Sequence, residues 1–201
     1  MVLLSTAYFG SQRPGYSHIS NFISELAETG APPTRFLSYA IYLPVGLMVW
    51  LALWLTHREA RERETSLVLL AMSCFGFGYV LGALFPCDQG APLFGSWRTL
   101  VHNVAAFIDY AGTGISFLLL SRRFLRQNAT PQAVGFLAAG AFVLACLAIL
   151  CSEATRNICG AVQRVAEATQ FAGMFFTCYL IPRKALAIMQ TPPSTKRRYD
   201  V

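Results

Sequence analysis

Long apolar runs, separated by short polar segments, dominate the pattern along this 201-residue chain. Five of them are long enough to cross a hydrocarbon core of about 30 Å, which takes about 20 residues of α-helix. These runs cover residues 36–55, 66–86, 100–120, 133–151 and 158–181. Backbone amides in lipid need partners within their own segment, so the runs predict helices rather than strands. The pattern predicts an all-α protein, a helical bundle embedded in a membrane.

The composition supports this interpretation. Hydrophobic residues make up 55% of the chain and charged residues only 13%, whereas a soluble domain carries about 25% charged residues. The alternative is a soluble protein in which the apolar runs form buried core helices. Five such runs in so short a chain leave too little polar surface to keep it in solution, which disfavours that alternative.

The N-terminal residues 2–10 are apolar but too short to span a membrane. No basic region precedes them, so they do not resemble a signal peptide. One interpretation is a partly inserted stub. The other is that the start lies upstream and most of a first span is missing, which would give six spans with both chain ends in the cytoplasm. We expect the second, and therefore five full spans plus a truncated first helix.

Basic residues alternate between the two sides of the predicted bundle. The segment 57–64, the loop at 122–126 and the tail at 183–201 hold most of the arginines and lysines, whereas the other loops carry only Arg13, Arg35, Arg98 and Arg156. Basic loops tend to stay in the cytoplasm. We expect one bundle over residues 1–182 with an extracytoplasmic segment at 11–35, followed by a basic cytoplasmic tail. The basic residues behind the formal charge of +6 then determine how the chain is oriented in the membrane, and they do not indicate nucleic-acid binding.

The tail ends with a basic cluster at residues 196–198. There it would either touch anionic lipid headgroups, at roughly 1 kcal/mol for each basic residue, or remain solvated. The segment 11–35 carries apolar residues at helical spacing. A short helix capped by Ser20 or Asn21 is expected to run to about Glu28, and the sequence GAPP after it turns the chain into the next span.

Polar side chains also occur inside two predicted spans. His102, Asn103 and Asp109 fall in one of them, and the last span carries a stripe formed by Gln163, Arg164, Glu167 and Gln170. Ionisable groups cost roughly 2.5–3.5 kcal/mol each within a membrane, so they normally face the bundle interior and have a function. The four ionisable groups, His102, Asp109, Arg164 and Glu167, fall in the outer half of the bilayer. The loops directly above them hold His18, Glu25 and Asp88. We expect an outward-opening polar pocket. The alternative is that the groups pair with one another, as Arg164 with Glu167, and only fix helix register.

Two functions fit such a pocket. In the first, the protein binds a lipid headgroup or small amphiphile, with Arg164, Arg13 or Arg35 attracting an anionic head. In the second, it is a membrane-embedded lipid hydrolase or transferase in which His102 is the general base, oriented by Asp109 or Asp88, and water or a serine attacks. We prefer binding, with membrane lipids as the partners. The expected ligand-binding residues are Tyr16, Ser17, Asn21, Ser24, Glu25, Asn103, Gln163, Arg164 and Glu167.

Other chemistries have weaker support. A metal site of His102, Asp88, Asp109 and His18 matches no compact ligand spacing, so no metal and no cofactor is expected. No nucleophile-elbow pattern surrounds the serines of the segment 11–35. A transporter would need paired broken helices. Among the cysteines, three near the outer ends would let two join in an oxidising compartment, in a pairing that stays open: Cys87, Cys151 and Cys159.

Three ordered blocks carry a resemblance to a known family. They are GYSHISNFISELAETGAPPTRFLSYAIYLPVGL, GALFPCDQG followed by LVHNVAAF, and GAVQRVAEATQF. With these blocks the chain resembles the bacterial and archaeal membrane family of domain of unknown function 998. The resemblance implies six spans and the bacterial cytoplasmic membrane, but no particular activity. The positions that match the family pattern are Tyr16, Ser17, Asn21, Ser24, Glu25, Pro86, Asp88, His102, Asn103 and Arg164.

Overall fold

The computed structural model describes residues 1–60 and 62–190, with side chains as far as residue 182. The secondary structure of this part is entirely helical. In chain order the elements are α1 (Val2–Gln12), the 3₁₀ helix η1 (Ile23–Ala27), α2 (Thr34–Phe36), the π-helix η2 (Leu37–Tyr42), α3 (Leu43–Glu59), α4 (Arg63–Leu84), α5 (Trp97–Arg126), α6 (Thr130–Leu150), the 3₁₀ helix η3 (Glu153–Ile158) and α7 (Cys159–Gln190). The all-α bundle expected from the sequence is confirmed.

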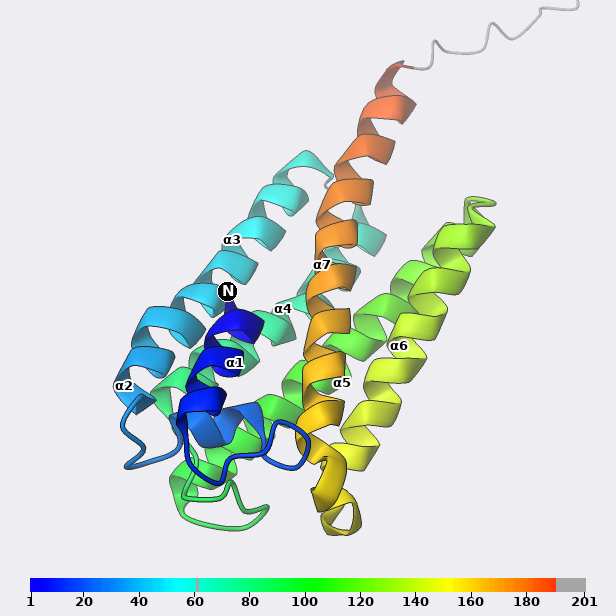
Figure 1. Ribbon diagram of the computed structural model, residues 1–201. Coiled ribbons are helices and arrows are strands. Elements are labelled where there is room, and N and C mark those ends of the chain that lie inside the picture. Colours follow the sequence, from blue (N-terminus) through cyan, green and yellow to red (C-terminus); the bar gives the residue numbers. More distant parts are fainter. Residues whose placement is uncertain (61, 191–201) are drawn as a thin grey trace, which may run out of the picture.

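The five long helices, α3 to α7, run up and down beside one another (Figure 1). Each packs on the next in the chain, and α7 also contacts α3 and α4. The segment 13–33 and the connections 85–96 and 151–158 gather at one end of the bundle, which we call the loop end (Figure 1). The short connections α3–α4 and α5–α6 lie at the other end, called the basic end.

Four stretches of the described chain are long and apolar enough to cross a membrane. They are Thr34–Glu59, Arg63–Leu84, Trp97–Arg126 and Thr130–Leu150, with mean hydropathies of 1.9, 2.1, 1.5 and 2.6. The sequence predicted a fifth span at 158–181. The structure forms a helix there, α7, but this helix carries the polar stripe and does not reach the same apolar composition. Its role as a fifth span stays a prediction.

The first of these stretches is helical throughout but changes its winding. Residues 37–42 form a wider π turn directly before Pro44. Proline has no backbone N–H to donate, and its ring crowds the carbonyl four residues earlier. A wider turn ahead of the proline accommodates both effects without breaking the helix.

Close contacts between backbones hold the helices together. On α5, Gly112 lies against Cys74 of α4, and Gly114 faces Gly140 of α6. Side chains add hydrogen bonds between helices: Trp50 donates to the Ser73 carbonyl (2.9 Å), Ser116 to Val68 (3.2 Å) and Ser121 to Ala133 (2.7 Å). Small residues and interhelical hydrogen bonds are the usual means of packing in lipid, where apolar surface alone gives no preference for protein over lipid tails.

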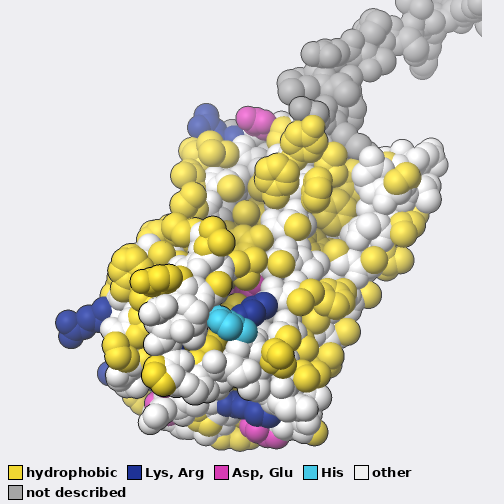
Figure 2. Space-filling view, viewed as in Figure 1, with side chains coloured by type: hydrophobic (Ala, Val, Ile, Leu, Met, Phe, Trp, Pro, Cys, Tyr) yellow, Lys and Arg dark blue, Asp and Glu magenta, His cyan; other side chains and the backbone are white. Residues whose placement is uncertain are grey.

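On the face shown in Figure 2, hydrophobic side chains cover much of the bundle between its two ends. At the basic end, Arg123 pairs with Glu62 (2.7 Å) and also bonds Thr65, while Arg126 pairs with Glu64. The basic loops predicted to face the cytoplasm therefore lie together, opposite the segment 11–35. The basic cluster at 196–198 lies outside the described residues. The predicted boundary at residue 183 falls within α7, so the division between bundle and tail stays a prediction.

Candidate functional site

The segment 13–33 folds over the loop end, but differently from the helix expected there. The expected helix ran from Ser20 or Asn21 to Glu28. The structure has five residues of 3₁₀ helix, Ile23–Ala27, preceded by an irregular stretch. The Glu25 carboxylate caps this helix by accepting from the Phe22 N–H (2.9 Å). A regular helix does not form because the backbone carbonyls of residues 18–21 accept hydrogen bonds from residues of α7 instead.

Arg164 is the main anchor of this stretch. Its Nη1 donates to the carbonyls of His18 (2.9 Å), Asn21 (3.1 Å) and Gly160 (2.8 Å). Its Nη2 donates to the Tyr16 hydroxyl (2.6 Å), which in turn donates to the Phe22 carbonyl (2.8 Å). Burial raises the pKa of Tyr16, although the hydrogen bond from Arg164 acts in the opposite direction. One guanidinium at the start of α7 thus binds four oxygens and fixes the path of the segment.

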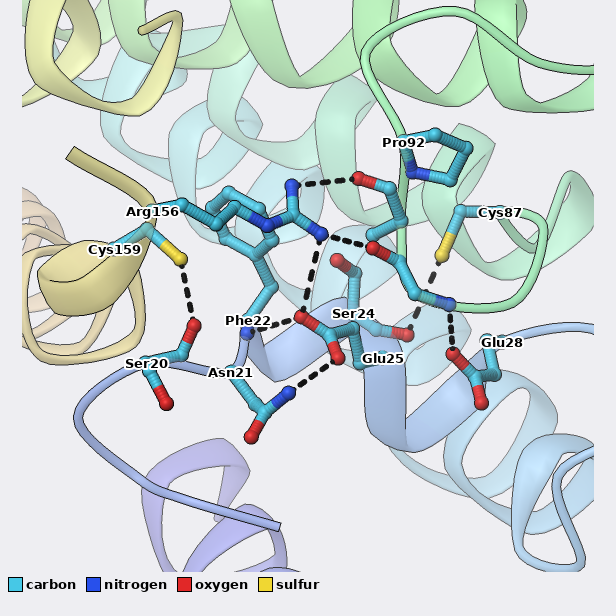
Figure 3. Close-up of polar contacts among 12 residues, drawn as sticks. Ser20, Asn21, Phe22, Ser24, Glu25, Glu28, Cys87, Pro92, Arg156 and Cys159 are labelled. Atoms are coloured by element: carbon cyan, nitrogen blue, oxygen red, sulfur yellow. Dashed lines mark hydrogen bonds and ion pairs between the residues drawn. The ribbon is translucent and has the colours of Figure 1, made fainter. Parts of the chain in front are cut away.

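A second set of contacts surrounds Glu25, which is 4% exposed. Its carboxylate accepts from the Asn21 side-chain amide (2.7 Å), in addition to its cap on η1. Arg156 lies 3.9 Å from the carboxylate, stacks over the Phe22 ring and donates to the carbonyls of Ala91 (3.1 Å) and Gly90 (Figure 3). Arg156 therefore links the segment 13–33 to the connection 85–96.

Glu28 makes a third link. It is 3% exposed and pairs with Arg13 (2.5 Å), and its other oxygen accepts from the Gly90 N–H (2.7 Å). Arg13 also donates to the Glu25 carbonyl (2.5 Å). A hollow of about 800 Å³ adjoins this pair, with Phe9, Leu26 and Phe36 among its lining residues. The two charged groups that line it already neutralise each other, so the hollow offers an outside ligand no free charge.

Two of the three outer cysteines bond to the same segment. The Cys159 thiol donates to the Ser20 carbonyl (2.9 Å) and the Cys87 thiol to the Ser24 carbonyl (3.6 Å), from different sides of the segment (Figure 3). Burial raises the pKa of Cys87 to about 12. Cys151 is exposed. All three are free thiols, so the disulfide that the sequence allowed among them is not formed.

His102 has neither carboxylate partner proposed from the sequence. Its Nδ1 bonds the Phe85 carbonyl (3.0 Å) at the end of α4. Asp88 instead accepts hydrogen bonds from the backbone N–H (2.7 Å) and the hydroxyl (2.9 Å) of Ser96, next to the start of α5. The bond from the Ser96 N–H is the main cause of the lowered pKa of Asp88. Asp109 bonds Gln170 of α7. Within the described residues, no hydrogen bond joins His102 to either carboxylate.

The pair of Arg164 and Glu167, which the sequence left open as an alternative, is not formed. Arg164 points to the segment 13–33, whereas Glu167 lies deeper, among α4 and α5. There its two oxygens accept from the hydroxyls of Tyr79 (2.6 Å) and Tyr110 (3.0 Å). Asp109 lies against Gly78, whose missing side chain leaves room for it. The described residues hold no group of three His, Cys, Asp or Glu side chains placed to bind a metal ion.

A small cavity of about 100 Å³ lies under the segment 13–33, among α5, α6 and α7. Its polar lining is Ser24, His102, Asn103 and Gln163, and Tyr110 also lines it. Two of these side chains also hold loops: Asn103 donates to the carbonyls of Pro92 and Leu93 (both 3.0 Å), and Gln163 accepts from the Ile23 N–H (2.6 Å). The rest of the lining is largely apolar and includes Phe107, Leu147 and Leu150.

Comparison with models of known protein families identifies the family of the chain. A family model described as "Protein of unknown function (DUF998)" matches residues 1–180, which is most of the chain. The chain belongs to the DUF998 family. The resemblance seen in three sequence blocks is thereby confirmed. No curated protein and no solved structure matches the chain. Together with its apolar helices, membership indicates that this DUF998 protein is an integral membrane protein with several spans.

The structure brings most of the predicted site residues of this DUF998 protein to the loop end. Tyr16, Asn21, Glu25 and Arg164 hold the segment 13–33 in place. The Ser17 hydroxyl accepts from the backbone N–H of Ser20 (3.4 Å) and of Ile19 (3.3 Å) within the same segment. These residues bond to the protein itself. The cavity is lined by a different subset: Ser24, His102, Asn103 and Gln163.

Four residues of this arrangement were not among the predicted site residues: Glu28, Tyr110, Arg156 and Gln170. Arg156 and Glu28 occur in segments that connect the long helices, where charged residues usually face solvent, so their residue type did not indicate a buried role. Gln170 was noted as part of the polar stripe. Tyr110 directly follows Asp109, and a polar tip beside a buried carboxylate was the signal that could have identified it.

The thiols provide a test of this packing. At pH 8 we expect a water-soluble maleimide to modify Cys151 of the purified protein quickly. Cys87 should react only after unfolding, because a pKa of about 12 leaves about one molecule in 10⁴ as thiolate. Raising the pH from 7 to 9 should accelerate labelling of Cys151 and leave Cys87 protonated. Peptide mass mapping reads each site, and equal rates at Cys87 and Cys151 would contradict the buried position.

Proposed function

We propose that this DUF998 protein binds the polar end of a small amphiphile in the cavity under the segment 13–33. The observation that carries the proposal is a set of polar atoms without partners. The Ser24 hydroxyl, His102 Nε2, Asn103 Oδ1 and Gln163 Nε2 make no hydrogen bond within the described residues, and all four side chains line the same cavity. All four side chains are half-buried, so these atoms can be reached from the cavity and are available to bond the polar group of a ligand.

The apolar part of the lining supports an amphiphile rather than a water-soluble ligand. Phe107 of α5 and Leu147 and Leu150 of α6 border the cavity near the loop end, and Phe107 is 54% exposed on the outside of the bundle. An acyl chain lying along α5 and α6 would have its headgroup at this depth. The cavity volume of about 100 Å³ fits the end of a headgroup, with the rest of the ligand outside.

The chemistry of the lining favours a hydroxyl or ammonium group. The Nδ1 of His102 contacts a carbonyl, which can only accept, so a neutral imidazole presents its Nε2 lone pair as an acceptor. Asn103 Oδ1 is a second acceptor. Of the three arginines expected to attract an anionic head, Arg164 and Arg13 are bonded to the protein, and Arg35 does not line this cavity. The structure therefore favours a neutral or cationic headgroup over an anionic one.

Catalysis is a second candidate, since Ser24 and His102 line one cavity. In this alternative His102 Nε2 would take the proton of the Ser24 hydroxyl or of a water as it attacks a lipid. Two observations argue against it. No hydrogen bond joins Ser24 to His102, and a backbone carbonyl rather than a carboxylate orients the imidazole. A carboxylate partner would stabilise the imidazolium that forms during the reaction.

Filling the cavity tests the binding proposal. Ala106 lines it, so Ala106→Leu should exclude a headgroup. Ser24→Ala removes a hydroxyl without breaking any bond within the described protein, and should weaken retention roughly fivefold, as expected for one hydrogen bond of about 1 kcal/mol. Native mass spectrometry of the protein, incubated with equal amounts of phosphatidylethanolamine and phosphatidylglycerol, measures the bound lipid. We expect wild type to retain phosphatidylethanolamine preferentially.

The matched control is Ala138→Leu, which adds the same side chain to an exposed position of α6 outside the cavity. It should retain lipid like wild type. Equal retention by wild type, Ala106→Leu and Ala138→Leu would refute binding in the cavity. A bound lipid found in wild type as a shortened product, and intact in His102→Phe, would favour the enzyme instead.

The same proposal includes an orientation, with the loop end outside the cytoplasm and the C-terminus inside. The concentration of arginines at the opposite end supports it. A membrane-impermeant maleimide added to intact cells should then modify Cys151 at the loop end, as read by peptide mass mapping. Modification of Cys151 only after the cells are lysed would place the loop end in the cytoplasm.

A further inference from the structure

Two carboxyl groups lie inside the bundle, below the cavity and away from both of its ends. Asp109 of α5 is 4% exposed and Glu167 of α7 is 5% exposed. Glu167 accepts hydrogen bonds from Tyr79 of α4 (2.6 Å) and Tyr110 of α5 (3.0 Å). Asp109 accepts from Gln170 of α7 (2.9 Å) and more weakly from Thr113 (3.5 Å). Three helices therefore contribute to one buried polar cluster.

No basic side chain neutralises this cluster within the described residues. The titratable groups that face it are phenols and a thiol on neighbouring elements: Tyr42 of η2, Cys74 and Tyr79 of α4, and Tyr110 of α5, beside which lies Cys146 of α6. Arg164 is bonded to Tyr16 and to three backbone carbonyls. Two ionised carboxylates here would be left without a counter-charge in a low-dielectric interior, which is strongly unfavourable.

The cluster also has more hydrogen-bond acceptors than donors. Its acceptors are the four carboxyl oxygens and Gln170 Oε1. The Gln170 side chain is fully buried, and its Oε1 has no hydrogen-bond partner. Its Nε2 bonds Asp109, so this unpartnered oxygen belongs to the same cluster. An unsatisfied acceptor beside two carboxyl groups without a counter-charge indicates that the site binds an additional proton.

We propose that Asp109 and Glu167 form a proton-binding site inside the bundle and that one of the two carboxyl groups stays protonated at neutral pH. Like-charged carboxyl groups in one buried site avoid double ionisation by retaining a proton. A metal cation is the competing occupant. It is disfavoured because Glu167 already uses each oxygen to accept from a phenol, and because the described residues contain no cluster of metal ligands.

Tyr110 gives this site a route to the cavity. Tyr110 lines the cavity and its hydroxyl donates to Glu167 Oε1. A proton that reaches the phenolic oxygen from the cavity would release the phenol's own proton to Glu167, so the phenol stays neutral and one proton has moved inward. Tyr79 donates to the other oxygen of Glu167 but does not line the cavity. The proton site does not depend on amphiphile binding, because it requires only water in the cavity.

Infrared spectroscopy of the full-length protein in lipid nanodiscs tests the proposal. A protonated carboxyl group has a carbonyl stretch that carboxylates lack, and this band shifts in D₂O. At pH 7 we expect the band in wild type and its loss in the double variant Asp109→Asn with Glu167→Gln, whose amides imitate neutral carboxyl groups. Wild type unfolded in detergent should also lose the band at pH 7, because its exposed carboxyl groups ionise. This second measurement needs no variant.

Exchange of the band into D₂O tests the route. Tyr110→Phe should slow it, whereas Tyr79→Phe, the matched loss of one phenol hydroxyl, should leave it at the wild-type rate. Absence of the band from folded wild type at pH 7 would overturn the proposal, as would a band that persists in the double variant. Loss of the band when sodium or potassium replaces choline in the buffer would show a metal cation site instead. Equal exchange in both tyrosine variants would refute the route through Tyr110.

Discussion

The bonds between the Arg164 guanidinium and three backbone carbonyls are the interaction on which the loop end of this protein depends. A chain segment that crosses the mouth of a membrane bundle without regular structure leaves carbonyls that need donors. Arg164 supplies them for His18 and Asn21 of the segment, it also bonds the Gly160 carbonyl of its own helix, and its second nitrogen holds Tyr16. Arginine suits this role because its planar group presents five donors and stays charged at all relevant pH values.

With the segment 13–33 held by Arg164, the polar groups below it form two levels. The first is the small cavity, whose roof includes Phe22 and Ser24 of the segment. The second is the pair of carboxyl groups, Asp109 and Glu167, deeper in the bundle. Tyr110 belongs to both levels, since it lines the cavity and bonds Glu167. The arrangement places polar groups in a column at the loop end, while the long helices expose many large hydrophobic side chains.

The sequence predicted the helices well, because apolar length is a strong signal for a membrane span. It predicted the contacts between site residues less well. Spacing along a helix shows which way side chains point, but not whether they are close enough to bond each other. His102 and Asp109 are seven residues apart and face the same way, yet two turns separate them by about 10 Å, too far for a hydrogen bond. Arg164 and Glu167 are three residues apart, but the long arginine side chain extends to the segment 13–33 and the glutamate bonds α4 and α5 instead.

The irregular segment was the hardest part to predict. Its hydrogen-bond partners are distant in sequence: Ile23 bonds Gln163, and Glu28 bonds Gly90. Helical spacing of Phe22, Ile23 and Leu26 suggested a regular helix, since a single sequence shows local periodicity but not these long-range bonds. Tertiary contacts outweighed the local preference, and the helix shortened to one 3₁₀ stretch over Ile23–Ala27.

Hydrogen–deuterium exchange of the protein with Arg164→Gln tests most directly whether this residue holds the segment. If the guanidinium holds it, amides of residues 17–28 should exchange more than about tenfold faster than in wild type, while those of α4 and α5 keep their protection. Arg35→Gln, a change of the same type at the same end, should leave the exchange of residues 17–28 unchanged. Unaltered exchange of residues 17–28 in Arg164→Gln would contradict the account.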